Sequence, residues 1–168
     1  ACAQADAIVT SGGVSVGEED HVRPALEAEG RVSLWQLAIK PGKPLAFGAV
    51  RRGPPNQGEA LFVGLPGNPV SSFVTFLLAA WPMIMALQGA AQRHATNNPM
   101  RADFAWPKPD TKRREFLRVR RNGQGGLDLF PNQSSGVLSS AVWGDGLVDV
   151  AVGQTVQQGD LVPFTPWS

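Results

Sequence analysis

The sequence has very little cysteine, with Cys2 the only one among 168 residues. An intramolecular disulfide is therefore excluded, and we expect a protein of a reducing compartment, the cytoplasm. An excess of charge is missing as well, because 15 lysines and arginines nearly balance 14 aspartates and glutamates. Since nucleic-acid binding usually shows as a basic excess on one face, we expect no nucleic-acid partner. Any anionic ligand must then be bound by local groups.

A long uninterrupted apolar run is also absent. The longest such stretch, residues 70–87, is interrupted by Ser71, Ser72, Thr75 and Pro82. It also lacks the charged flank and the position of a signal peptide, so we predict a buried helix and no membrane partner. The chain does not begin with Met, and its first apolar run starts at residue 7. We therefore expect a fragment of a longer protein.

The composition that is present is typical of a globular protein, with 43% hydrophobic and 17% charged residues. In the first half of the chain, short apolar runs alternate with helical patterns. We predict helices over residues 20–29 and 68–87, and strands over residues 7–10, 32–39, 45–50 and 61–64. This alternation predicts the α/β fold class, with a largely parallel sheet.

The pattern changes after the second predicted helix. Residues 88–98 are polar and lead into Pro99, and no later window sustains a helical period. We therefore predict a domain boundary here, with an α/β domain over residues 1–90 and a second domain over residues 91–168.

The second domain has the pattern of a small all-β barrel or sandwich. Residues 114–121 alternate, and a glycine-containing turn separates them from residues 127–130, which predicts a hairpin. Further apolar runs between such turns lie at Val137, Val142, 147–152 and 161–164. We interpret the arginines of this region as a mostly solvated strand face. They are Arg113, Arg114, Arg118, Arg120 and Arg121.

The first candidate site is the loop after the strand predicted at residues 7–10. Paired glycines let a backbone approach a ligand closely, serine hydroxyls can donate hydrogen bonds, and N–H groups before a helix favour a phosphate. A flexible turn would have the same composition, so the loop alone leaves both interpretations open. Its candidate substrate-binding residues are Ser11, Gly12, Gly13, Ser15 and Gly17.

An acidic run, Glu18-Glu19-Asp20, follows this loop directly. Such runs commonly complement the dipole at the start of a helix, and Asp20 can cap the helix that follows. The functional alternative is that Asp20 binds Mg²⁺, which prefers carboxylate oxygens combined with the phosphates of a ligand. His21 and His94 are isolated from each other, which argues against a histidine metal site.

A second candidate loop joins the strands predicted over residues 32–39 and 45–50. Two lysines stand three residues apart, and two prolines stiffen the segment. Ammonium groups on a rigid turn suit an oxyanion such as phosphate or molybdate, whereas a solvated hairpin would not need this rigidity. The candidate residues of this loop are Lys40, Pro41, Gly42 and Lys43.

The third candidate loop follows the strand predicted at residues 61–64 and opens the 68–87 helix. Asn68 is placed as an N-cap residue with proline at the first helical position. The prolines and glycines here can be purely architectural, but a helix N-terminus also presents N–H groups that suit an anion. The candidate residues are Gly64, Pro66, Gly67, Asn68 and Pro69.

In their order and spacing, the three loops resemble those of one family. The segments Ser-Gly-Gly-Val-Ser-Val-Gly-Glu-Glu-Asp (11–20), Ala-Ile-Lys-Pro-Gly-Lys-Pro (38–44) and Gly-Leu-Pro-Gly-Asn-Pro-Val-Ser (64–71) are similar to those of the molybdopterin molybdenumtransferases. This family includes bacterial MoeA proteins and the E domain of gephyrin. The resemblance continues through residues 114–119 and 145–147, and it implies the latter half of a molybdopterin-binding α/β domain followed by a β-barrel-like domain.

The resemblance also implies a reaction, the insertion of molybdate into adenylyl-molybdopterin with release of AMP, assisted by Mg²⁺ or Zn²⁺. Carried over by position, Asp20 would help to hold the metal or a phosphate, and Lys40 and Lys43 would hold the oxyanion. Ser135, in a loop at residues 133–135, would bind substrate. The partners implied are small-molecule substrates and, in the full-length enzyme, a second copy in a homodimer.

Two other functions stay open. Molybdopterin adenylyltransferases share the Ser-Gly-Gly loop, although the all-β second domain and the Lys-Pro-Gly-Lys-Pro turn count against this function. A scaffold like the E domain of gephyrin would bind a receptor segment instead. Family members also carry two further N-terminal domains and an acidic, glycine-containing motif that does not precede Ala1 here, so we expect the isolated chain to be inactive.

Overall fold

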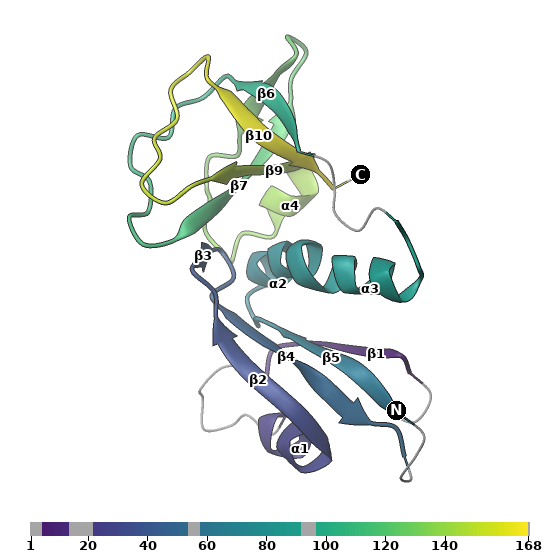
Figure 1. The fold of residues 1–168 in the computed structure, drawn as a ribbon. Coiled ribbons are helices and arrows are strands. Elements are labelled where there is room, and N and C mark those ends of the chain that lie inside the picture. The colour runs from purple at the N-terminus through teal and green to yellow at the C-terminus, as the bar shows by residue number, and fades with distance from the viewer. Residues whose placement is uncertain (1–4, 14–21, 54–57, 92–96, 168) are drawn as a thin grey trace. The chain divides into compact units, whose positions relative to one another are not determined.

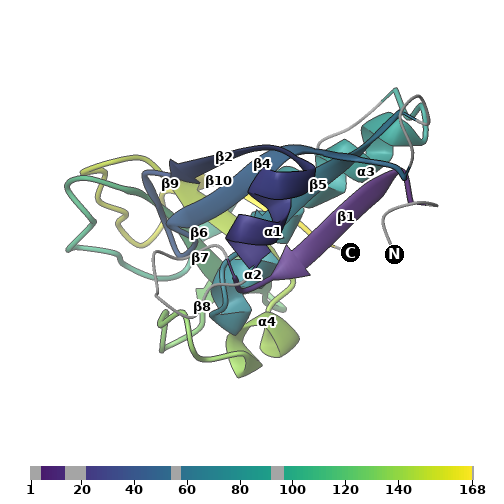
Figure 2. The ribbon, with the colours of Figure 1, turned by 90° about the horizontal axis from the view of Figure 1, so that it is seen from below.

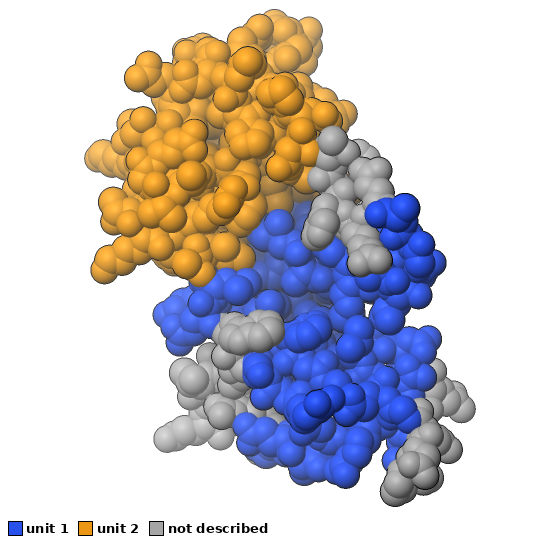
Figure 3. Space-filling model, viewed as in Figure 1, with its two compact units in different colours: residues 1–37, 42–93 blue, residues 38–41, 94–168 orange. Residues whose placement is uncertain are grey.

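The structure is a computed structural model of the chain, and it describes residues 5–13, 22–53, 58–91 and 97–167. The chain forms two compact units, which Figures 1 and 3 show. Unit 1 comprises Ala1–Leu37 and Gly42–Arg93, and unit 2 comprises Ala38–Pro41 and His94–Ser168. The short segment Ala38–Pro41 therefore groups with the second half of the chain, although the sequence places it inside the first domain.

Unit 1 is a four-stranded sheet with helices on both faces, so the predicted α/β class is confirmed. The first helix, α1, spans Val22–Glu29. The strands, given in their order across the sheet, are β1 Ala7–Ser11, β5 Glu59–Leu65, β4 Pro44–Arg51 and β2 Gly30–Gln36. Each strand contains or overlaps one of the apolar runs of the sequence, as expected for strands buried between layers.

The sheet is mixed rather than largely parallel. β1 runs parallel to β5, whereas β4 is antiparallel to both β5 and β2. The reason is the length of the connections, because residues 37–43 and 52–58 are too few for the crossover that a parallel pair requires. β1, β5 and β2 therefore end at the same edge of the sheet, and β4 begins there.

Each face of the sheet packs against a helix, because side chains alternate along a strand. Ala46 of β4 and Phe62 of β5 are buried on one face, where Leu26 of α1 packs against them. Leu45 and Val63, one position along on the same strands, are buried on the other face with the long helix that follows β5. The two helices lie on opposite sides of the sheet in Figures 1 and 2.

The long helix consists of three consecutive segments, α2 Pro69–Thr75, the π-helical η2 Phe76–Ala80 and α3 Trp81–Leu87. Asn68 is its N-cap residue and a proline follows, which confirms the predicted start. In the π-helical segment, the backbone N–H of Trp81 donates to the carbonyl of Phe76, five residues earlier. This wider segment precedes Pro82, which has no backbone N–H to donate. The π-helical turns accommodate the hydrogen bond that the helix lacks at this proline.

The predicted burial of this helix is confirmed only in part. Val70, Val74 and Ala80 are buried, whereas Trp81 and Leu87 are 44% and 47% exposed. By length and composition alone the helix could cross a membrane, with a mean hydropathy of 1.9 over Pro69–Leu87 and 28% of that window buried. The core helix of a globular protein passes the same test, and Phe76, Ala79, Ala80 and Met83 of this helix pack on the sheet of unit 1.

Unit 2 is a closed barrel of five strands in the order β7-β8-β6-β10-β9, in which β9 also pairs with β7. The two-residue strand β3, Ile39–Lys40, adds to β7 in parallel. One short helix, α4, spans Ser139–Trp143. The barrel strands are β6 Asn98–Ala102, β7 Arg114–Arg121, β8 Gly126–Leu129, β9 Gly146–Val150 and β10 Leu161–Pro166.

The predicted all-β barrel and its β7–β8 hairpin are confirmed. One strand was not predicted, because β6 follows the polar stretch and contains a proline, yet it pairs with β10. One local expectation is wrong. Val142 lies in α4 instead of a strand, and its side chain is 83% exposed, so its apolar character does not mark a core-facing position.

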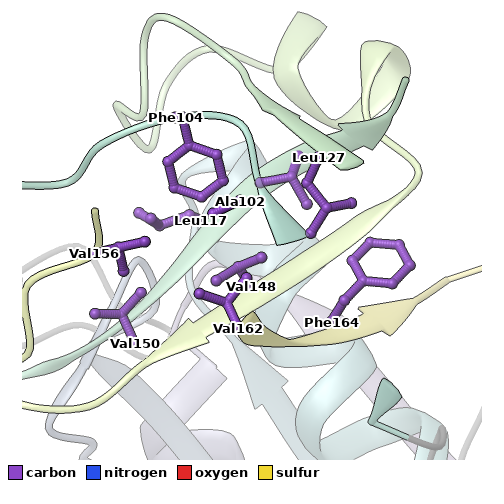
Figure 4. Close-up of a cluster of buried hydrophobic side chains, with 10 residues drawn as sticks. Ala102, Phe104, Leu117, Leu127, Val148, Val150, Val156, Val162 and Phe164 are labelled. Atoms are coloured by element: carbon purple, nitrogen blue, oxygen red, sulfur yellow. The ribbon is translucent and has the colours of Figure 1, made fainter. Parts of the chain in front are cut away.

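The barrel interior is a continuous apolar core. Figure 4 shows side chains from all five strands that converge on it, among them Ala102, Leu117, Leu127, Val148 and Val162. Each of these residues is at most 2% exposed. Such close packing makes the barrel a rigid support for polar groups at its surface and ends.

Candidate functional site

The first and third candidate loops lie side by side in unit 1. Ser11, at the end of β1, pairs with Leu65, at the end of the parallel strand β5. The backbone N–H of Gly12 then donates to the carbonyl of Leu65 over 2.9 Å. Both loops therefore leave the same edge of the sheet, where ligands of open α/β sheets commonly bind.

Two glycines lie where the loops approach each other. A Cβ atom added to Gly12 would lie 3.9 Å from the Cα of Gly67, so the two backbones are in contact distance. Gly12 and Gly13 also have φ angles of 82° and 72°, which side chains rarely adopt. The backbone is thus exposed to a ligand without intervening side chains. Ser15, Gly17 and Asp20 lie outside the described residues.

The helix that begins in the third loop holds this loop in place. Ser72 donates its backbone N–H to the carbonyl of Asn68 over 2.8 Å and its hydroxyl to the carbonyl of Pro66. Gly64 and Pro66 are buried, whereas Gly67, Asn68 and Pro69 are exposed. The exposed part of the loop lies at the helix N-terminus, where N–H groups without helical partners favour an anion.

The second loop is divided between the units, with Lys40 and Pro41 in unit 2 and Gly42 and Lys43 in unit 1. Pro41 and Gly42 are buried, and Gly42 has a φ of 114°, so this turn depends on a glycine. Lys43 is exposed, while its carbonyl accepts the N–H of Leu37 over 2.7 Å. The turn is thus held by buried backbone and by this hydrogen bond, and its rigidity stays a prediction from its prolines.

Lys40 is not a free surface lysine. Its ammonium donates to Glu115 over 3.0 Å, and the side chains are 43% and 2% exposed. The second carboxylate oxygen accepts the indole N–H of Trp106 and the backbone N–H of Asp110, each over 2.8 Å. Burial raises the pKa of Glu115, but these three donors together lower it below its usual value. The carboxylate is therefore ionised and holds the ammonium in place.

One edge of β7 brings two predicted site elements together. β3 occupies this edge at Arg114 and Glu115, and β8 occupies it from Val119 onward. In the gap between them, the side chain of Gln133 pairs with the backbone of Arg118, accepting its N–H over 2.9 Å and donating to its carbonyl over 3.0 Å. Lys40 and the 132–135 loop thus stand three residues apart along one strand, or roughly 10 Å.

Arg118 contradicts the interpretation of this region as a solvated strand face. Arg114, Arg120 and Arg121 are exposed as expected, but Arg118 is 1% exposed. Within the described part of the chain, its guanidinium donates to neutral oxygens, the carbonyls of Phe116 and Ser134 at 3.3 and 3.2 Å and the Ser140 hydroxyl at 3.2 Å. Sequence reasoning missed this residue because alternating arginines are typical of an exposed face.

Glu115 was not predicted as a site residue either, and Gln133 was named only as the first residue of the loop that carries Ser135. A single glutamate in a basic strand and a glutamine in a polar loop have no spacing that indicates their contacts. Ser135 follows Gln133 and is half-buried. Of the predicted residues, the structure therefore brings together Ser11, Gly12 and Gly13 with the third loop in unit 1, and Lys40 with the loop of Ser135 in unit 2.

A metal site is not formed by the described residues alone. Within residues 5–13, 22–53, 58–91 and 97–167, no three histidine, cysteine, aspartate or glutamate side chains lie close enough to share an ion. Asp20, the predicted metal ligand, and both histidines fall outside these ranges. The described side chains thus do not by themselves fit a divalent cation.

Comparison with known families matches both units. A family described as "Probable molybdopterin binding domain" matches residues 1–86, and one described as "MoeA C-terminal region (domain IV)" matches residues 99–167. The fold is similar to the "molybdopterin biosynthesis moeA protein" of Pyrococcus horikoshii, with a TM-score of 0.70 and 20% identity. That similarity covers 96% of this chain and 36% of the other.

Individual relatives agree with these family matches. The molybdopterin molybdenumtransferase of Haemophilus influenzae is 53% identical over 89 residues, which are 53% of this chain and 20% of that protein. The molybdenum cofactor synthesis protein cinnamon of Drosophila melanogaster is 35% identical over 153 residues, 86% of this chain and 24% of that protein. The chain thus spans about a quarter or less of the length of these two relatives.

Proposed function

Because this chain belongs to the molybdenum cofactor biosynthesis family of the MoeA proteins, we propose that the protein containing it inserts molybdate into adenylyl-molybdopterin and releases AMP. The observation that carries this proposal is the edge of β7, where Lys40 and the loop of Ser135 stand beside each other on a rigid barrel. Molybdate is a compact dianion, and an ammonium group near hydroxyl and N–H donors suits it.

The loops of unit 1 support the second half of the proposal, the binding of the adenylylated pterin. Its phosphate groups need N–H donors that a ligand can approach closely. The Gly12–Gly13 backbone and the exposed turn at Gly67 and Asn68 offer such donors at one sheet edge. In this proposal Ser11, Pro69 and the neighbouring loop residues bind the substrate, and Lys43 adds a positive charge to the oxyanion site.

We include Mg²⁺ or Zn²⁺ in the proposal only as an ion that Asp20 would hold together with ligand phosphates. The described residues add no ligand cluster for it, so no step of the reaction is assigned to the ion. The single cysteine supports the cytoplasm as the compartment. A homodimer of the full-length enzyme is likewise part of the proposal.

The test is turnover in the complete protein. Adenylyl-molybdopterin and molybdate are supplied to the wild type and to the variant Lys43→Ala, and released AMP is measured. Lys108→Ala is the matched control, because Lys108 is an exposed lysine of unit 2 far in sequence from the loops. We expect AMP release to depend on molybdate in the wild type and in the control, and to need a higher molybdate concentration in Lys43→Ala.

The other two functions would give different results in this assay. An adenylyltransferase would form adenylyl-molybdopterin from ATP and molybdopterin, without dependence on molybdate. A scaffold would release no AMP under any of these conditions. Either outcome would overturn the proposed reaction while leaving the family assignment intact.

A further inference from the structure

The buried guanidinium of Arg118 has no role in the proposed function, yet it is the most unusual charge in unit 2. A cation removed from water is costly unless a partner compensates for it. Among the described residues, no carboxylate forms a salt bridge with Arg118, and its three acceptors are neutral oxygens. Burial lowers the pKa of Arg118 to about 10, so the group remains charged at neutral pH.

Apart from the carbonyl of Phe116 on β7 itself, the side-chain and backbone hydrogen bonds of Arg118 described above go to the segment that carries Ser135. Its guanidinium donates to the carbonyl of Ser134 and the hydroxyl of Ser140, which in turn donates to the carbonyl of Val137 over 2.7 Å. Its backbone N–H and carbonyl are bound by the amide of Gln133. The residue therefore fixes the segment before and after Ser135 from two directions.

The position of this segment on β7 places it beside Lys40, at the proposed oxyanion site. Gln133 fills the gap between β3 and β8, so its side chain completes the strand edge that also carries Lys40. The amide also donates to the carbonyl of Phe130 over 2.8 Å, which closes the loop on itself. An unpaired positive charge directly behind such a loop favours an anion in front of it, since interactions are weakly screened where water is excluded.

We infer that Arg118 is a positioning residue that fixes the 132–135 loop beside Lys40, and that the oxyanion site of the proposed function depends on it. This inference rests on the proposed function, because it takes molybdate as the anion. Arg118 itself does not touch the ligand, since its side chain is buried behind the loop. It acts through the backbone of Ser134, the side chain of Ser140 and the positive potential that it adds to the loop.

The test uses the complete protein and four variants. Arg118→Met keeps the length of the side chain and removes the charge and the donors, and Arg118→Lys keeps the charge without the planar fork. Gln133→Leu releases the loop while Arg118 stays intact. Arg120→Met is the matched control, because Arg120 lies on the same strand but is exposed, with its guanidinium 4.4 Å from the centre of the Trp143 ring.

Two quantities are measured for each folded variant, the Kd of molybdate by calorimetry and the hydrogen exchange of backbone amides in residues 130–138. We expect Arg118→Met to raise the Kd about tenfold or more and to speed exchange, because charge-assisted hydrogen bonds are lost. Arg118→Lys should recover part of the affinity but not the slow exchange. Gln133→Leu should speed exchange and weaken binding, and Arg120→Met should change neither by more than about twofold.

A purely structural arginine would give another pattern. Faster exchange in Arg118→Met and Gln133→Leu with an unchanged Kd would overturn the dependence of the oxyanion site on this positioning, and unchanged exchange would overturn the positioning role. Should Arg118→Met fail to fold, Gln133→Leu decides between these results by the same two measurements. If the wild type itself does not bind molybdate, the proposed function fails and this dependence with it, whereas the exchange data still decide whether Arg118 fixes the loop.

Discussion

The candidate sites of the two units consist of different kinds of groups. In unit 1 the site is made of backbone, with Gly12 and Gly67 in close approach at the ends of two parallel strands. In unit 2 it is made of buried side chains, with Glu115 holding Lys40 and Arg118 fixing the loop of Ser135. The first kind of site depends on which backbone angles are allowed, and the second depends on compensated burial of charge.

This difference teaches what each site tolerates. A backbone site is sensitive to side chains at positions with a positive φ, such as Gly12, but indifferent to the identity of exposed side chains nearby. A site made of buried polar side chains is sensitive to the loss of single atoms, because each buried donor left without an acceptor costs about 1–3 kcal/mol. Single substitutions in each unit, each with a control variant, test this comparison directly.

The largest effect is expected for Glu115→Ala in unit 2. The substitution leaves the indole N–H of Trp106 and the backbone N–H of Asp110 without their acceptor. We expect the free energy of unfolding to fall by about 2–4 kcal/mol, measured by urea denaturation of the complete protein. Glu59→Ala, which breaks the exposed pair with Arg31 in unit 1, is the control and should cost about 0–1 kcal/mol.

Equal losses in the two glutamate variants would contradict this comparison. They would mean that water replaces the carboxylate of Glu115 without cost. The variant Glu115→Gln separates charge from hydrogen bonding, because its amide oxygen can still accept one of the two N–H groups. It should be more stable than Glu115→Ala and should still lose the ion pair with Lys40.

The next largest effect is expected for Gly12→Ala. Gly12 and Gly125 have φ angles of 82° and 75°, so an alanine at either position should cost about 1–2 kcal/mol of stability from backbone strain. Gly125 lies in the exposed turn between β7 and β8, with nothing within 4 Å of an added Cβ. Only Gly12→Ala should also weaken the binding of AMP, measured by calorimetry on the complete protein. Equal AMP affinities in both variants would show that the first loop is an ordinary turn.

This contrast also explains how much of the molecule could be predicted from its sequence. The apolar runs at residues 7–10, 45–50 and 61–64 mark strands, and Asn68-Pro69 marks a helix start, because local preferences and burial agree there. The loops of unit 1 were identifiable because glycine and proline are required by backbone geometry. Strand direction was not, since it depends on how far each connection must reach.

In unit 2 the sequence could not indicate the site in the same way. Arg118 and the exposed Arg120 are both basic residues of one alternating strand, and only tertiary packing of the 130–143 segment buries the first. Glu115 is likewise defined by partners from β3 and from residues 106–110. Networks of this kind join residues far apart in the chain, so no local spacing predicts them.

A smaller effect is expected on the pH dependence of stability in unit 2. Hydrogen bonds from Arg101 and then Asn122 lower the pKa of Asp103 from 3.8 to about 2. Because the folded pKa is depressed, this contribution is fully present above about pH 4 and is lost as the pH falls toward 2. Asp103→Asn should therefore flatten the loss of stability between pH 4 and 2, measured by thermal unfolding at each pH. The control Asp6→Asn in unit 1 should leave that slope unchanged, and an equal flattening in both variants would contradict the assignment to Asp103.

The smallest effect on stability is expected for Lys43→Ala, and it separates the two lysines of the second loop. Lys43 is exposed and only its backbone carbonyl is engaged, so the free energy of unfolding should change by less than about 0.5 kcal/mol. Lys40→Ala should cost more, because it removes the ammonium from the buried carboxylate of Glu115, although the half-exposed lysine limits this cost to about 1 kcal/mol. If both charges hold the oxyanion, both variants should raise the Kd of molybdate, measured by calorimetry on the complete protein. A raised Kd for Lys40→Ala alone would assign the anion site to the side chains of unit 2, and unchanged affinity in both would show that the loop is a rigid turn without a role in binding.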